Sequence, residues 1–245
     1  MNLLEVQGLR KTYPAFRLED VSFSVPEGAV MGLIGRNGAG KSTTLKSILG
    51  LVHPDAGRVE MFGREFSENE RYIKENIGVV LGGIDFYPKK KVKAITDVTR
   101  RFYSNWQEEK YRHYLDLFAI DENKRVDQLS SGMRVKYLLA LALSHNARLL
   151  ILDEPTSGLD PVSRDELTEL LRRIAADGTR SVLFSTHITS DLEKCASHIT
   201  FIQEGRLQRS DTLAGFMAHY ADLGSTLEEI IVAAERRPYD ADAII

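Results

Sequence analysis

The segment from Gly35 to Thr43, GRNGAGKST, follows the pattern G-x-x-x-x-G-K-[S/T] of a phosphate-binding loop. Its glycines let the backbone surround phosphate oxygens with N–H groups. We expect Lys41 to reach the β- and γ-phosphates of a nucleotide, and Ser42 to bind Mg²⁺. The sequence therefore predicts a nucleotide phosphate site. Its expected binding residues are Gly35, Asn37, Gly38, Ala39, Gly40, Lys41, Ser42 and Thr43.

Two acidic residues, Asp153 and Glu154, end the apolar run LLILDE. In doubly wound sheets, ligands lie at the carboxyl ends of the strands, where the glycine-rich loop also lies. We therefore expect Asp153 to hold Mg²⁺ through water. Glu154 is then nearer the γ-phosphate, where a carboxylate can take the proton of an attacking water. Taken alone, the pair also fits a plain strand end before a turn.

A second feature suited to anions is LSSGM, from Leu129 to Met133. Its serines can supply N-cap oxygens to a helix, and its glycine leaves the first backbone N–H groups open. A helix N-terminus of this kind attracts anions. The chain thus contains two features that could bind phosphate.

Three further residues have both a structural and a functional interpretation. Asp160 before Pro161 is typical of an N-cap followed by a first-turn proline. His187, after the strand-like run SVLFST, is by itself more typical of a surface loop. Tyr13 in LRKTYP can pack against the protein or stack on a base.

The elements around these motifs alternate between strands and helices. AVMGLIG and RLLIL are nearly continuous apolar runs, typical of strands buried on both faces. DVSFSV alternates and places Val21, Phe23 and Val25 on one face. Helices are expected from Lys41 and over 161–176. Together these patterns indicate an α/β fold with a parallel sheet and crossover helices.

The composition sets limits on the function. The chain has 245 residues, 43% of them hydrophobic, which is enough for one large α/β domain. Its formal net charge of −3 argues against a nucleic-acid partner. The only cysteine, Cys195, excludes an internal disulfide and fits a reducing cytoplasm. No apolar run approaches the ~18–20 residues of a membrane span, so we expect any membrane role to require a partner.

The ordered set GRNGAGKST, LSSGM, LLILDEPTSGLD and STH, with Tyr13 ahead of it, resembles the ATPase cassette of ABC transporters. The resemblance covers about residues 1–232 and implies one P-loop NTPase (ABC ATPase) domain. That domain has an N-terminal antiparallel β-subdomain and an inserted helical sub-lobe at about 84–145. A short C-terminal tail, 233–245, follows it.

The resemblance also implies roles for single residues, with ATP and Mg²⁺ as cofactors. Glu154, His187 and Lys41 are implied as catalytic, His187 as the family's switch histidine. Ser42 and Asp153 are implied as the metal-binding pair.

The resemblance also implies that several further residues bind nucleotide. Tyr13 matches the aromatic residue that stacks on adenine, and Asp160 lies in the loop after the Walker B strand. LSSGM matches the signature loop, which in such cassettes contacts the nucleotide of a second copy packed head to tail. Ser130 and Gly132 are therefore expected to contact that copy's γ-phosphate.

The expected partners are a second ATPase subunit and separate transmembrane permease subunits. The protein would then lie in the cytoplasm, peripheral on the inner face of the cell membrane. The tail STLEEIIVAA resembles that of ABC-2-type exporter ATPases, which favours export. The run KKKVK, Lys89 to Lys93, is either a solvated charge run or a contact with a permease loop or acidic lipid headgroups.

One departure from the family pattern affects catalysis. Gly82 stands where the family has a glutamine or glutamate. Because Glu154 and His187 remain, we predict a slow but real ATPase. Two alternatives stay open: a nucleotide-gated binding module with little hydrolysis, and a soluble ABC ATPase that acts on nucleic acid.

Overall fold

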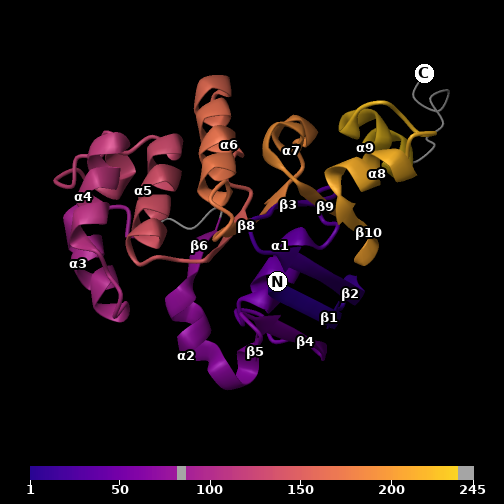
Figure 1. Ribbon diagram of the computed structural model, residues 1–245, viewed down its shortest axis with the longest axis horizontal. Coiled ribbons are helices and arrows are strands. Elements are labelled where there is room, and N and C mark those ends of the chain that lie inside the picture. The colour runs from indigo at the N-terminus through magenta and orange to yellow at the C-terminus, as the bar shows by residue number, and fades with distance from the viewer. Residues whose placement is uncertain (82–86, 237–245) are drawn as a thin grey trace.

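The computed structural model describes residues 1–81 and 87–236. Within these residues the strands form one ten-stranded sheet, in the order β5-β4-β1-β2-β10-β9-β3-β8-β7-β6 (Figure 1). Helices cover both faces of its parallel part, and a separate group of helices lies at one side. The architecture confirms the predicted α/β P-loop fold with an antiparallel β-subdomain and a helical sub-lobe.

The N-terminal part of the sheet is antiparallel. Its strands are β1 (Asn2–Tyr13), β2 (Phe16–Pro26), β4 (Ala56–Met61) and β5 (Arg64–Glu65). The predicted alternation in β2 is confirmed, since Val21, Phe23 and Val25 are buried while Ser22 is exposed. This alternation gives the subdomain one face toward the core and one toward water.

The other part of the sheet is mainly parallel. Its strands are β3 (Val30–Ile34), β6 (Ile77–Leu81), β7 (Leu149–Asp153), β8 (Ser181–Thr186), β9 (His198–Gln203) and β10 (Arg206–Thr212). Every residue of β3, β7 and β8 is buried, as the continuous apolar runs predict. The carboxyl ends of these strands therefore meet at one edge, where the motifs follow them.

Two layers of helices enclose this sheet. Helix α1 (Lys41–Ile48) buries Leu45 and Ile48 in the core that it shares with the antiparallel strands, and α2 (Phe66–Asn76) adds Ile73 to it. The opposite face is covered by α6, α7, α8 and α9. These helices are Pro161–Ala175, Thr189–Cys195, Leu213–His219 and Leu227–Glu235.

The helical lobe has its own small core. It consists of α3 (Val92–Thr99), η1 (Arg100–Phe102), α4 (Glu108–Leu117), η2 (Val126–Gln128) and α5 (Ser131–Ser144). The hydroxyls of Tyr111 and Tyr137 lie 2.7 and 2.9 Å from Thr96 Oγ1, and burial raises the pKa of Tyr111 to about 12. Tyr111 therefore belongs to the core of the lobe.

The domain boundary predicted at residue 232 falls inside α9, which continues to Glu235. Leu227 and Ile230 of α9 are fully buried against the parallel part of the sheet. Helix α9 is therefore part of the domain's packing, and residues 233–235 of the predicted tail belong to it.

Candidate active site

The phosphate loop connects β3 to α1. Gly40 is the N-cap of α1 with φ of +114°, a conformation that favours glycine. At Gly35 a side chain would place its Cβ 2.2 Å from the carbonyl oxygen of Ile202, so only glycine fits there. The loop opens on a pocket of about 610 Å³. Its lining residues are Ala15, Phe16, Asn37, Gly38, Gly40, Lys41, Ser42, Thr43, Glu154, Ser157 and His187.

Lys41 is only 5% exposed and is held by its own loop. Its Nζ donates to the carbonyl oxygens of Gly35 at 2.7 Å and Arg36 at 3.3 Å. Within the described residues its ion-pair partner is Glu154, whose Oε1 lies 3.4 Å away. A buried cation needs an anionic partner. Exchange of this carboxylate for a phosphate oxygen remains a prediction.

Asp153 lies at the end of β7 and links two neighbouring elements. Its Oδ1 accepts hydrogen bonds from Ser42 Oγ at 3.1 Å and Ser185 Oγ at 2.6 Å. A hydroxyl and a carboxylate fit Mg²⁺, which typically takes few protein ligands and completes its shell with phosphate oxygens and water. No group of three or more His, Cys, Asp or Glu that could hold a metal ion is found within residues 1–81 and 87–236.

Glu154 follows β7 in a left-handed backbone conformation, with φ of +50°. Such strain persists only where the surroundings fix it, and here the Glu154 N–H donates to Ser185 Oγ at 3.0 Å. The Oε2 atom of Glu154 lies 2.9 Å from Nδ1 of His187, the residue that follows β8. The structure thus brings Lys41, Glu154 and His187 together from three elements, as a general base and its orienting partners require.

The signature segment LSSGM forms a separate feature. Ser130 is the N-cap of α5, and its Oγ accepts from the Met133 N–H at 3.2 Å, which confirms the predicted cap. Ser130 is exposed, whereas Gly132 is buried. Among the described residues, none from Leu129 to Met133 lines the pocket around Lys41.

Asp160 caps α6, as its sequence position predicts. Its Oδ1 accepts from the N–H groups of Val162 and Ser163, both at 3.0 Å. A further bond from the Ser163 hydroxyl, together with these amides, lowers the pKa of Asp160. Any contact of Asp160 with nucleotide remains a prediction.

The predicted base-stacking residue, Tyr13, lies at the end of β1, directly opposite Phe16 of β2. Tyr13 is 39% exposed, and its ring centroid lies 5.8 Å from Lys11 Nζ. Phe16, and not Tyr13, is among the residues that line the pocket. Sequence reasoning missed Phe16, whose signal was its position just across the hairpin from Tyr13.

Ser185 was also missed. It is a fully buried polar residue near the carboxyl end of strand β8, and it bonds both Asp153 and the Glu154 backbone. Its signal was a serine in the run SVLFST, next to the histidine.

Three further residues or segments of the sequence analysis are Gly82, the lysine run 89–93 and Cys195. Gly82 lies outside the described residues. Lys89, Lys90, Lys91 and Lys93 are exposed, while Val92 between them is buried. Burial raises the pKa of the Cys195 thiol to about 12.

Comparisons with known proteins agree with this geometry. The sequence profile of the family described as "ABC transporter" matches residues 18–157. The chain is 32% identical over 208 residues to the bacitracin transport ATP-binding protein BcrA of Bacillus licheniformis, covering 84% of this chain and 68% of that protein. It is 38% identical over 191 residues to the Nod factor export ATP-binding protein I of Burkholderia orbicola, covering 76% and 62%.

A solved structure of an ATP-binding subunit of an ABC transporter superimposes with a TM-score of 0.85. It is 28% identical in sequence and covers 96% of this chain and 100% of that one. The chain therefore belongs to the ABC transporter family, as an ATP-binding ATPase domain. It spans about two thirds of the length of the curated relatives named above. In the described part of the chain, no helix has both the length and the apolar character needed to cross a bilayer.

Proposed function

We propose that this chain binds and hydrolyses ATP in order to power an ABC exporter through separate permease subunits. The observation that carries the proposal is the cluster of Lys41, Glu154 and His187 beside the phosphate loop. A relative named for bacitracin transport supports a role in transport, and one named for Nod factor export supports the assignment to export.

Each residue of the cluster has a separate task in hydrolysis. Lys41 leaves Glu154 and binds the β- and γ-phosphates, which frees the carboxylate. Glu154 then accepts the proton of the attacking water, and His187 holds Oε2 of the Glu154 carboxylate in place. Ser42 and Asp153 would hold Mg²⁺, which neutralises charge on the phosphates when it is bound.

A second ATPase subunit completes the site. The capped N-terminus of α5 is exposed and belongs to another part of the surface than the pocket around Lys41. In a head-to-tail pair, Ser130 and Gly132 of one copy meet the γ-phosphate bound by the other, and twofold symmetry repeats the contact. Loss of the γ-phosphate then favours release of the pair. Tyr13, with Phe16 beside it, would contact the base, and Asp160 would lie at this interface.

The permease is expected to bind between β6 and the helical lobe. A mainly apolar cavity of about 280 Å³ lies there, lined by residues that include Leu81, Ile95, Tyr103 and Leu138. Two exposed apolar residues of the same lobe, Val98 and Phe102, are 55% and 72% accessible.

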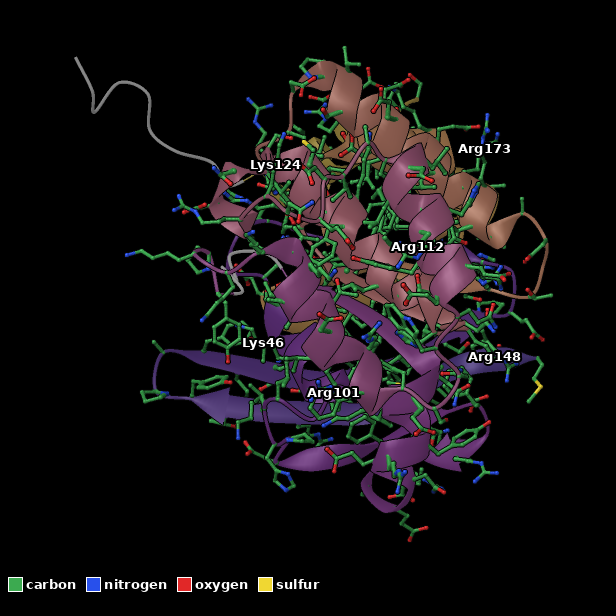
Figure 2. The ribbon with its side chains drawn as sticks, turned by 90° about the vertical axis from the view of Figure 1, so that its left-hand side faces the viewer. Lys46, Arg101, Arg112, Lys124, Arg148 and Arg173 are labelled. Atoms are coloured by element: carbon green, nitrogen blue, oxygen red, sulfur yellow. The ribbon has the colours of Figure 1, made fainter. Side chains whose placement is uncertain are left out.

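Figure 2 looks onto this side of the molecule, with Arg101 of η1 and Arg112 of α4 on the outer surface. Such a contact would place the chain at the cytoplasmic face of the membrane, with the lysines of 89–93 near the permease or the lipid.

Two measurements test the proposed function. The purified protein should release phosphate from MgATP slowly, and faster when its permease is present. Gentle solubilisation of membranes should co-purify the chain with an integral membrane protein. Absence of phosphate release in both preparations would favour a nucleotide-gated module, and an ATPase stimulated by DNA or RNA would favour the nucleic-acid alternative.

A further inference from the structure

Glu235, the last residue of α9, lies against the start of the phosphate loop. It is 7% exposed, and its Oε1 accepts a hydrogen bond of 3.1 Å from the backbone N–H of Arg36. Its Oε2 lies 3.6 Å from Arg36 Nε. Burial raises the pKa of Glu235, while Arg36 and Lys41 oppose that shift. A carboxylate is thus brought from residue 235 to the loop that follows β3.

Helix α9 holds this carboxylate in place from both of its ends. At its start, Thr226 and Glu229 form a capping box, and the Leu227 N–H donates to Glu193 at 2.7 Å. Near its end, Gln203 Nε2 donates to the Ala234 carbonyl at 3.1 Å. Because the helix is fixed, the Glu235 carboxylate is delivered to the loop in a defined position.

The bonded amide belongs to the peptide unit between Gly35 and Arg36. The carbonyl oxygen of the same peptide, that of Gly35, accepts the 2.7 Å hydrogen bond from Lys41 Nζ. One peptide group therefore contacts Glu235 through its N–H and the phosphate-binding lysine through its C=O. A hydrogen bond at one end of a peptide orients it and strengthens the bond at the other end.

We propose that Glu235 is a positioning residue for nucleotide binding, acting through the Gly35–Arg36 peptide on Lys41. It does not touch the nucleotide. It fixes the orientation of the loop that binds the phosphates, so the C-terminal helix contributes to ATP affinity. This inference rests on the proposed ATP binding.

The test compares Glu235→Ala and Glu235→Gln in the full chain. Affinity for Mg²⁺ and the non-hydrolysable analogue AMP-PNP is measured by calorimetry, and KM and kcat by phosphate release. The alanine variant should bind about tenfold more weakly, the loss typical of a bond to a charged group. Its KM for ATP should rise while kcat at saturating ATP stays within twofold. Glutamine keeps an acceptor oxygen for the Arg36 amide and should restore affinity to within about threefold.

Two control variants separate the amide bond from other effects. Glu228→Ala removes the same charge from an exposed site on α9 and should leave affinity unchanged. Arg36→Ala removes the ion pair with Glu235 but keeps the backbone bond, and should weaken affinity less than Glu235→Ala does.

Three outcomes would overturn the inference. The first is unchanged affinity in Glu235→Ala. The second is tighter binding by that variant, which would show that the Glu235 charge only repels the phosphates. The third is failure of Glu235→Gln to restore the affinity for AMP-PNP. Melting temperatures show whether each variant is folded. If Glu235→Ala is unfolded, the test rests on Glu235→Gln and Arg36→Ala. A loss of affinity in folded Glu235→Gln would then overturn the inference. Failure of the wild-type chain to bind AMP-PNP would instead contradict the proposed function.

Discussion

The phosphate loop and the N-terminus of α5 both suit an anion, but they differ in where their partners come from. Lys41 is buried and already bonded to Gly35, Arg36 and Glu154 of its own chain. Ser130 is exposed, and within residues 1–81 and 87–236 its hydroxyl accepts a hydrogen bond from the local Met133 amide. The first feature can bind a nucleotide within one chain. We propose that the second acts on a γ-phosphate that another molecule brings to it.

Glu154→Gln should separate the two features most strongly. The amide cannot accept the proton of water, so phosphate release at saturating MgATP should fall by about 10²–10⁴-fold. Nucleotide binding by the single chain should persist, because Lys41 and the loop are intact. Glu228→Gln on exposed α9 is the matched control. Turnover at the parental rate would show that another group is the base.

Lys41→Ala should disable the phosphate loop itself. Loss of a charged hydrogen-bond donor should weaken ATP binding by about 10- to 100-fold, measured by calorimetry. Lys46→Ala, on the exposed side of the same helix α1, removes an equal charge and should have no effect (Figure 2). Equal losses in the two variants would indicate general electrostatic attraction instead of a defined contact.

At the far end of α5, His145 should make stability depend on pH. Its ring is 2% exposed and stacks on Tyr103 with centroids 3.7 Å apart. Burial lowers the pKa of His145 to about 4 from 6.5. The unfolded chain therefore binds a proton between these values that the folded chain does not, so stability falls as pH falls through that window.

From pH 7 to pH 5 this residue should cost about 2 kcal/mol of the free energy of unfolding. Urea unfolding of the wild type and of His145→Phe, which keeps the ring stack, measures the difference. The same pH dependence in both proteins would show that the histidine is not responsible.

Ser130→Ala should have the smallest effect on the isolated chain. Loss of the N-cap should lower the free energy of unfolding by about 0.5–1 kcal/mol, because the freed Met133 amide can bond to water. ATP binding by the monomer should stay within twofold, whereas ATP-dependent pairing should weaken. Reduced binding by the monomer would place α5 at the nucleotide of its own chain.

The sequence predicted the parts of the site that short motifs encode. The phosphate loop, Asp153 and Glu154 follow apolar strands, and the parallel sheet necessarily brings such strand ends together. The structure also places His187 beside Glu154, which the residue alone did not indicate. The fold class followed in the same way, from alternating strands and helices.

The missed residues act through tertiary contacts that no local pattern contains. Ser185 supports Asp153 from the neighbouring strand, and Phe16 reaches the pocket across a hairpin. Glu235 meets the phosphate loop from 199 positions along the chain. The domain boundary was placed at residue 232 from the extent of the family resemblance, and the packing of α9 up to Glu235 is not contained in that resemblance.

Sedimentation of Glu154→Gln with saturating MgATP tests the shared γ-phosphate most directly. We predict a dimer with MgATP and a monomer with MgADP or without nucleotide, and loss of that dimer when Ser130→Ala is added. A Glu154→Gln protein that binds MgATP yet remains monomeric at every concentration would contradict the head-to-tail site.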